Sequence, residues 1–319
     1  MIRVAQNLQS AGKAGGRLAS AKGLGTFKAY RKLLKFICNA SSTPMTHIDL
    51  SAWRVKAEHA FQLKNLATLP AEADMTKDIQ DNEWPVLFQK AAEKLEKLQL
   101  MLHAGKSKGL LLVLQGMDTA GKDGSIRSVF SHVSPLGVRA EAFGVPSEEE
   151  QRHDFLWRIH RKAPALGEMA IFNRSHYEDV LVPRVRGWID KSAWLKRYQH
   201  IANFEALLHD QGVTVLKCYL HISKQEQKKR LQARLDDPLK QWKLQASDFS
   251  DRQLWPDYLE AYQEAMTATS SANAPWYVIP ADSKRYRDLF LAELLVHTLE
   301  KMGLAFPPKS FDLSTVQLD

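Results

Sequence analysis

The stretch GLLLVLQ at residues 109–115, followed directly by GMDTAGKDG at residues 116–124, decides the fold. The first segment is a continuous apolar run of strand length, typical of a strand buried on both faces of a parallel sheet. The second fits GxxxxGK, the phosphate-binding P-loop, in the strand–loop–helix context that this motif requires. Glycines let the backbone wrap around an anion, N–H groups at the helix N-terminus face phosphate oxygens, and Lys122 adds a positive charge. The alternative is a glycine-rich turn with a surface lysine, and the flanking strand and helix favour phosphate binding over it.

Two carboxylates distinguish this loop from the usual P-loop pattern. The position after the lysine is Asp123, where a P-loop normally carries a Ser or Thr whose hydroxyl helps to hold Mg²⁺. Asp118 lies inside the loop itself. Because a hard cation prefers oxygen ligands, we expect Asp118 to replace the missing hydroxyl as a metal ligand. The weaker interpretation of Asp118 is a carboxylate that stabilises the turn.

Segments of strand and helix pattern alternate along the rest of the chain. Further strands are predicted at residues 169–173, 214–222 and 276–281. Helices are predicted at residues 81–103, 124–132, 194–209, 223–235, 256–267 and 283–302. Strands that alternate with helices imply a parallel sheet covered by helices on both faces. We therefore expect an α/β fold, a P-loop three-layer sandwich with about five parallel strands.

Charged side chains follow the predicted strand that ends at Asn173, at the sheet edge where open α/β folds bind ligands. Asn173 stands where a P-loop enzyme usually carries a carboxylate. Arg174 and Arg184 can bring positive charge to phosphates. Glu178 and Asp179 are either metal or base groups, or acids that complement the N-terminus of a helix.

A basic helix pattern precedes a loop at residues 236–254. Arg230 and Arg234 are four residues apart and therefore share one face of the predicted helix. Lys240 and Lys243 follow in the loop, where P-loop kinases carry a lid over the transferred phosphoryl group. A lid excludes water and brings cations to developing negative charge. We interpret the segment as a lid in preference to a solvated basic surface.

The charge of the chain is unevenly distributed. Its 319 residues carry 44 Lys and Arg against 36 Asp and Glu, a formal net charge of +8. Eight of the basic residues and no acidic ones lie in residues 1–44, so the remainder has no net charge and does not indicate a nucleic-acid or membrane partner. We interpret residues 1–44 as a basic leader, disordered or preceding the native start at Met45. Residues 45–104 are expected to be a helical extension packed on the core, and residues 105–319 the P-loop kinase domain.

Cysteine and histidine provide no site of their own. Cys38 and Cys218 cannot form a disulfide framework, and neither belongs to a cluster with metal-ligand spacing. No apolar run approaches the roughly 20 residues of a membrane-spanning helix. His176, beside Tyr177, is interpreted as a structural histidine, and the default compartment is a reducing cytoplasm.

Five phrases of the sequence resemble, in this order, the polyphosphate kinase 2 family: LLLVLQGMDTAGKDG, HDFLWRIHRKAP, IFNRSHYEDVLVPRV, HISKQEQKKRLQARLDDPLKQWK and APWYVIPADSKRYRDL. The resemblance implies a thymidylate-kinase-like fold with a helical lid. It also implies a Mg²⁺-dependent enzyme, with Mn²⁺ as a substitute, that transfers the terminal phosphoryl group of inorganic polyphosphate reversibly to ADP or AMP. We expect a cytoplasmic homo-oligomer, a dimer or tetramer, with no nucleic-acid or membrane partner.

The resemblance implies roles for individual residues as well. The implied catalytic residues are Asp118, Lys122, Arg174, Arg184 and Arg230. The implied phosphate- and nucleotide-binding residues are Gly116, Gly121, Lys122, Asp123, Gly124, Arg234, Lys240 and Lys243. Asp118 is the implied metal ligand, and Asn173 is a second candidate because many members of the family carry Asp there.

Two other functions remain open at this point. An ATP-dependent nucleoside monophosphate kinase would share the P-loop, the fold and the lid, but the absence of Ser or Thr after Lys122 argues against it. A non-enzymatic polyanion-binding protein would use the basic leader and would leave Asp118 and Lys122 without a role.

Overall fold

The computed structural model describes residues 48–56, 61–70, 83–312 and 316. The chain divides into two compact units, Met1–Met45 and Thr46–Asp319. The first unit, with the predicted basic leader, lies outside the described residues. The fold and the site belong to the second unit.

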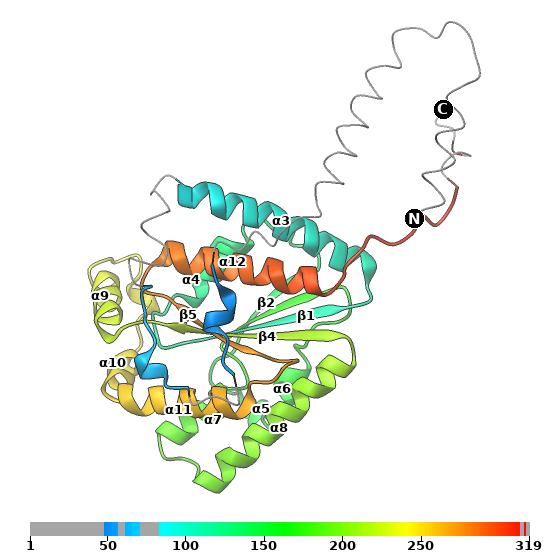
Figure 1. The fold of residues 1–319 in the computed structure, drawn as a ribbon. Coiled ribbons are helices and arrows are strands. Elements are labelled where there is room, and N and C mark those ends of the chain that lie inside the picture. Colours follow the sequence, from blue (N-terminus) through cyan, green and yellow to red (C-terminus); the bar gives the residue numbers. More distant parts are fainter. Residues whose placement is uncertain (1–47, 57–60, 71–82, 313–315, 317–319) are drawn as a thin grey trace, which may run out of the picture. The chain divides into compact units, whose positions relative to one another are not determined.

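A five-stranded sheet forms the centre of this unit (Figure 1). Its strand order is β2-β3-β1-β4-β5, and every neighbouring pair is parallel. The strands are β1 (Gly109–Gln115), β2 (Val138–Ala142), β3 (Met169–Asn173), β4 (Val213–His221) and β5 (Trp276–Pro280). The predicted α/β fold with about five parallel strands is confirmed.

Helices cover both faces of the sheet. In Figure 1, α3, α4 and α12 lie on one face and α7, α8 and α11 on the other, with α9 and α10 at one end of the strands. The α-helices are α3 (Glu83–Gly105), α4 (Lys122–Phe130), α5 (Glu148–Gln151), α6 (Trp157–His160), α7 (Glu178–Val185), α8 (Lys191–Asp210), α9 (Lys224–Leu235), α10 (Ala246–Gln253), α11 (Trp255–Thr269) and α12 (Lys284–Lys301). Three short 3₁₀ helices are η1 (Leu50–Trp53), η2 (Leu63–Asn65) and η3 (Gln241–Lys243). All six predicted helices are present.

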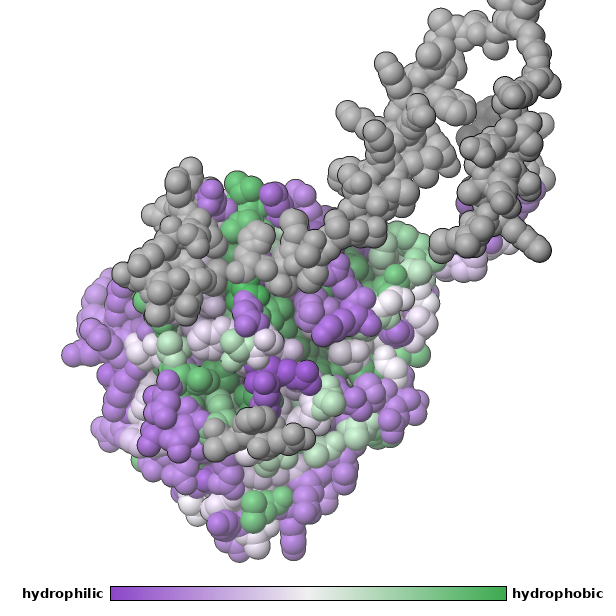
Figure 2. Space-filling view, in the orientation of Figure 1, coloured by the Kyte–Doolittle hydropathy of each residue, from purple (hydrophilic) through white to green (hydrophobic). Residues whose placement is uncertain are grey.

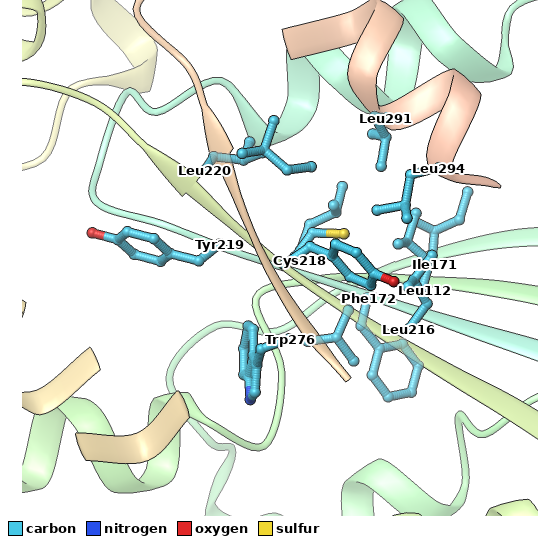
Figure 3. Packing of buried hydrophobic residues seen from close by; sticks show 14 of the residues in the cluster. Leu112, Ile171, Phe172, Leu216, Cys218, Tyr219, Leu220, Trp276, Leu291 and Leu294 are labelled. Carbon is cyan, nitrogen blue, oxygen red and sulfur yellow. The ribbon is translucent and has the colours of Figure 1, made fainter. Parts of the chain in front are cut away.

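The apolar run of β1 becomes the middle of the core. All seven of its residues are buried, because β1 pairs with β3 on one side and β4 on the other while helices cover both faces. Leu291 and Leu294 of α12 lie on one side of the sheet, and Trp276 of β5 points to the opposite side (Figure 3). Burial of each such side chain stabilises the fold by about 1.5–3 kcal/mol, so the strand that carries the P-loop is held firmly.

Strand β2 is not among the strands predicted from the sequence. Its sequence VRAEA places charged residues between small ones, and none of its residues is fully buried. It is an edge strand that pairs only with β3, and Arg139 donates to Glu141 over 2.9 Å and to Glu168 over 3.3 Å. An edge strand satisfied by ion pairs lacks the continuous apolar signal that reveals a central strand.

No apolar run of membrane-spanning length occurs in the sequence, and the described helices bear on the same property. On the face drawn in Figure 2, hydrophilic residues gather over α9 and α10. None of the helices in the described parts of the chain is long and apolar enough to cross a membrane.

Candidate phosphate-binding site

The P-loop connects the end of β1 to the start of α4, as predicted. Gly116 and Gly121 have φ values of 154° and 109°, in the region that favours glycine. A Cβ on Gly116 would lie 2.9 Å from the carbonyl oxygen of Leu220, and one on Gly121 would lie 1.9 Å from Nη1 of Arg287. Both positions therefore favour glycine by conformation. At Gly116 the backbone of Leu220 also leaves no space for a Cβ, and at Gly121 the guanidinium of Arg287 would have to move. Gly124 lies in the first turn of α4, whose N-terminal N–H groups lack partners within the helix.

Lys122 is held inside the loop. Its Nζ donates to the carbonyl oxygen of Gly116 over 2.6 Å and to that of Met117 over 3.4 Å, and the side chain is buried. Burial lowers the pKa of Lys122, the nearby charge of Arg174 lowers it further, and Asp118 and Glu178 oppose the shift. The ammonium group thus lies within the loop that a phosphate would enter.

Arg174 and Asp118 form an ion pair across two motifs. Nη2 of Arg174 donates to Oδ1 of Asp118 over 2.8 Å. Burial opposes the charge of Arg174, but the carboxylates of Glu178 and Asp118 outweigh it and raise the pKa of the guanidinium. Arg174 has a φ of 62°, and Thr119 in the P-loop has a φ of 63°. Positive φ values in non-glycine residues store strain of order 1–3 kcal/mol each and often mark functional sites.

Glu178 lies beside this pair at the start of α7. Burial raises the pKa of Glu178, against the lowering effect of Arg174 and Lys122. With its amide nitrogen towards Glu178, Gln115 donates to Oε1 of Glu178 over 2.9 Å and accepts from Oγ of Ser175 over 3.0 Å. Of the two acids whose role the sequence left open, Glu178 is therefore at the site.

Asp179 has a structural partner instead. Its Oδ2 accepts from Nη2 of the buried Arg158 over 3.0 Å. Burial raises the pKa of Asp179, and the charge of Arg158 opposes that shift.

Asn173 and Lys243 both approach Asp123. The amide nitrogen of Asn173 donates to Oδ1 of Asp123 over 2.7 Å, which leaves the amide oxygen as the group able to accept. Nζ of Lys243 lies 4.0 Å from Oδ2 of Asp123 and 5.1 Å from the ring centre of Trp242. Asp123 thus joins the end of β3, the start of α4 and the segment predicted to be the lid.

The predicted lid segment contains η3 and α10. Arg186, which follows α7, donates to Oγ of Ser250 over 3.2 Å and forms an ion pair with Asp251. Asp248 of α10 is buried, and burial followed by the negative charge of Asp118 raises the pKa of Asp248. Lys240 is exposed and pairs with Asp237 three residues away. The segment therefore reaches the P-loop through Lys243 and Asp248, whereas Lys240 stays at the surface.

Arginines of the predicted site differ in their surroundings. Arg230 donates to carbonyl oxygens of the P-loop itself, with distances of 3.0 Å to Thr119 and 2.9 Å to Ala120. Arg234, one turn later on α9, is half-buried and lowers the pKa of Asp248 against burial and Asp118. Arg184 pairs with Glu264 at 2.6 Å and lies 4.8 Å from the ring centre of Trp194, so it joins α7 to α11 and α8.

Sequence reasoning missed two groups of residues that support the site. The first is Arg287 of α12, which packs against Gly121. The second is a buried polar network beneath the loop after β3, whose members are His176, Tyr177, Glu205, Lys217 and Thr269. Both depend on contacts between residues far apart in sequence, so no local spacing could reveal them. The structural interpretation of His176 agrees with its burial in this network.

A divalent cation would have to share its ligands with a substrate here. Among the residues that the structure describes, no three or more His, Cys, Asp and Glu side chains are grouped to hold a metal ion. Asp118, Glu178 and the amide of Asn173 carry oxygen atoms of the kind that Mg²⁺ prefers as ligands. Mg²⁺ commonly binds through one or two carboxylates plus substrate phosphates and waters. The donor set therefore fits Mg²⁺ together with a phosphate.

Comparison with known proteins gives consistent matches. Residues 79–307 match the family described as "Polyphosphate kinase 2 (PPK2)". A relative from Meiothermus ruber, named AMP/ADP-polyphosphate phosphotransferase, is 47% identical over 260 residues that cover 81% of this chain and 96% of the relative. The ADP-polyphosphate phosphotransferase of Rhodopseudomonas palustris is 38% identical over 272 residues, with coverages of 82% and 88%. The crystal structure of polyphosphate kinase 2 from Arthrobacter aurescens has a TM-score of 0.79 and 40% identity, covering 86% of this chain and 95% of that one.

Proposed function

The chain belongs to the polyphosphate kinase 2 family, and from this premise we propose which of its residues transfer the terminal phosphoryl group of inorganic polyphosphate to ADP and AMP. The observation that supports the assignment is the meeting of Lys122, Asp118 and Arg174 at the P-loop, where Arg174 lies 2.8 Å from Asp118. Two of these residues come from the P-loop motif and one from the end of β3. Fold, motif and relatives agree on phosphoryl transfer as the reaction, and neither alternative function gains support.

The reaction requires positioning and charge neutralisation more than covalent catalysis. We assign Lys122 and the N–H groups at the start of α4 to the phosphate that enters the loop. Arg174 would neutralise a non-bridging oxygen, and its pairing with Asp118 holds the guanidinium in place beforehand. The attacking nucleotide phosphate is largely ionised at neutral pH, so a strong general base is not needed.

The lid would complete this arrangement. Lys243 already lies 4.0 Å from Asp123 and is placed to bring positive charge to the mouth of the P-loop. Arg234 is the second cation that we assign to the closed lid. Lys240 would have to leave Asp237 before it contacts a phosphate. The role predicted for Arg184 requires the same kind of exchange, because its guanidinium is occupied by Glu264.

We assign the divalent cation, Mg²⁺ or Mn²⁺ in its place, to Asp118, with Asn173 and Glu178 as further oxygen ligands. When bound, the ion would neutralise negative charge on the phosphate oxygens of the substrates. Asp118 is suited to hold it because its carboxylate lies in the P-loop, where Arg174 contacts Oδ1. Removal of the metal by a chelator should abolish transfer, and readdition of Mg²⁺ should restore it.

One assay tests the proposed function. The purified full chain is offered Mg²⁺ and polyphosphate with AMP, ADP, GMP or GDP in separate reactions, and the products are resolved over time. A further reaction contains ATP and AMP without polyphosphate. We expect ATP from ADP, and ADP followed by ATP from AMP.

Two results would overturn the proposal. Turnover with ATP and AMP but none with polyphosphate would identify a nucleoside monophosphate kinase. No turnover with any acceptor, together with polyphosphate binding that disappears when residues 1–44 are deleted, would identify a polyanion-binding protein.

A further inference from the structure

Arg230 has no hydrogen-bond donor left for a substrate. A guanidinium carries five N–H donors. Nε of Arg230 donates to Oε1 of Glu226 over 2.8 Å. Nη1 donates to the carbonyl oxygens of Thr119 and Ala120, and Nη2 donates to those of Ala281 and Asp282 over 2.6 and 3.0 Å. The five contacts use all five donors, and two of them hold the P-loop.

A second guanidinium, which is buried, contacts the same loop. Nη1 of Arg287 lies 3.4 Å from the carbonyl oxygen of Ala120, and the side chain is 2% exposed. Its Nε and Nη2 both contact Oδ1 of Asp288, over 2.8 and 2.7 Å, and Asp288 also accepts from Oγ of Ser125 in α4 over 3.1 Å. Arg287 therefore links α12 to the P-loop and, through Asp288, to α4.

Both arginines act on a single peptide group. The carbonyl of Ala120 and the N–H of Gly121 belong to one planar trans peptide and point in opposite directions. A carbonyl drawn towards Arg230 and Arg287 turns the N–H of Gly121 to the other side of the loop. Gly121 can adopt the backbone conformation that this orientation requires, because a φ of 109° is accessible to glycine. A peptide flipped the other way would present a carbonyl oxygen to a phosphate and repel it.

We propose that Arg230 and Arg287 are positioning residues that lock the Ala120–Gly121 peptide with its N–H towards the bound phosphate, and that neither guanidinium contacts the phosphate. This inference rests on the proposed phosphate-binding role of the P-loop. It gives Arg230 a different task from direct contact with substrate, and it gives Arg287 a role in the site. The two guanidinium groups also lie on the carbonyl side of the peptide dipole, where their positive charge favours the orientation that offers N–H to an anion.

Nuclear magnetic resonance can test the peptide orientation without any ligand. Labelling with carbonyl-¹³C alanine and ¹⁵N glycine selects the Ala–Gly peptides, of which the chain has four, ending at Gly12, Gly15, Gly105 and Gly121. In Arg230→Lys and in Arg287→Lys, the Ala120–Gly121 signal should move because the carbonyl loses hydrogen bonds. The Ala104–Gly105 signal, at the end of α3, should stay in place. A stationary Ala120–Gly121 signal in both variants would overturn the proposal even if the enzyme proves inactive.

Kinetics of the same variants link the orientation to transfer. With folded protein confirmed by circular dichroism, kcat/KM for polyphosphate should fall at least tenfold in Arg230→Lys and in Arg287→Lys. Lys229→Ala, which removes an exposed cation one residue away, should retain the wild-type value. A moved signal with unchanged kcat/KM would show that the peptide orientation does not matter, and would equally overturn the proposal.

A crystal structure of the wild-type protein with polyphosphate covers the case in which the variants fail to fold. We expect Arg230 to keep its contacts to Thr119, Ala120, Ala281 and Asp282, and the N–H of Gly121 to donate to a phosphate oxygen. A guanidinium of Arg230 or Arg287 within hydrogen-bond distance of a phosphate oxygen would overturn the proposal. Phosphate bound elsewhere would refute the proposed function instead, while the orientation of the peptide in that structure would still decide this inference.

Discussion

The negative charge of Asp118 serves two interactions, one with Arg174 and one with the proposed divalent cation. Asp118 accepts from Arg174 over 2.8 Å and is the carboxylate proposed to hold the divalent cation. Its backbone carbonyl also accepts from Nε2 of Gln227 over 3.1 Å, which ties this part of the loop to α9. A change limited to the carboxylate therefore tests its charge and leaves the backbone contact in place.

Asp118→Asn should lower kcat by about two to three orders of magnitude, the effect seen when one preorganised electrostatic contact of a transition state is lost. The expected loss follows from a weaker metal site and a freed Arg174. Steady-state transfer from polyphosphate to ADP measures it, with near-ultraviolet circular dichroism to confirm the fold. Asp210→Asn is the matched control. Asp210 ends α8 just before β4 begins, so it lies at the N-terminal end of the strands, whereas the P-loop lies at their C-terminal end. Equal kinetics in the two variants would contradict the assignment of Asp118.

Gly121 combines a positive φ with close contact to Arg287, so an added methyl group would displace the guanidinium of Arg287. Gly121→Ala should destabilise the protein by at least about 1–3 kcal/mol and should reduce transfer per folded molecule, because Arg287 must move. Urea unfolding and initial rates measure the two effects. Gly144→Ala is the control, because a Cβ at Gly144 meets no atom within 4 Å. If Gly121→Ala proved as stable and active as this control, the packing against Arg287 would be of no consequence.

At the scale of elements, the strands show what sequence can and cannot predict. β1, β3, β4 and β5 are largely buried and rich in apolar residues, so their positions could be predicted to within a residue or two. β2 could not, since an edge strand need not be apolar and its ion pairs satisfy charges that would otherwise argue against a strand. The start of the P-loop helix could be predicted because glycine and lysine spacing there is a local property. Arg287 could not, because its approach to the loop depends on how α12 packs.

Helix α10 lies in the segment that we propose as the lid, and Arg186 contacts it through Ser250 and Asp251. Arg186→Gln should therefore release α10 from α7. We expect faster hydrogen exchange in residues 246–253, measured by mass spectrometry, and a several-fold higher KM for polyphosphate, because a looser lid costs binding energy to close. The global unfolding midpoint should change little.

Lys196→Gln is the control for this prediction, because it removes an exposed cation from α8 at a place outside the site. Unchanged exchange in residues 246–253 of Arg186→Gln would show that α10 is held by other contacts. Arg252 is the next candidate, since its Nη1 donates to the carbonyl oxygen of Lys224 over 2.7 Å and to Oε1 of Gln227 over 2.8 Å.

At the scale of the whole molecule, the buried polar network explains why the site keeps its shape. Lys217 of β4 is fully buried and pairs with Glu205 of α8, and it also donates to the carbonyl oxygen of Thr269 over 2.7 Å. The hydroxyl of Tyr177 donates to Thr269 over 2.7 Å and joins the loop after β3 to this group. Removal of one partner from a buried ion pair typically costs about 3–5 kcal/mol. The loop that carries Arg174 is thus fixed by residues of three other elements.

His176 makes this network sensitive to acid. Its ring is fully buried, and Nε2 lies 3.3 Å from Oε1 of Glu205. Burial lowers the pKa of His176, and the charge of Lys217 adds to the shift against the opposing effects of Glu205 and Asp179. In the unfolded chain a histidine takes up a proton near pH 6.5, whereas the folded protein resists protonation until the lower pKa is reached. The neutral His176 therefore makes its full contribution to the free energy of unfolding above about pH 6.5, and this contribution is lost as the pH falls below that value.

The free energy of unfolding should decrease between pH 7.5 and pH 5.5, and the contribution of His176 to this decrease is at most about 1.4 kcal/mol, because pH 5.5 lies one unit below the pKa of the unfolded histidine. His221, whose pKa burial also lowers, adds a decrease of the same sign. Glu178 and Asp179 act in the opposite direction at lower pH, because their raised pKa values favour protonation in the folded state. Comparison with His176→Gln isolates the contribution of His176, since the amide keeps a donor towards Glu205 but does not titrate. Urea unfolding at both pH values should give a smaller decrease for the variant, and an equal decrease in both proteins would assign the acid sensitivity to other groups.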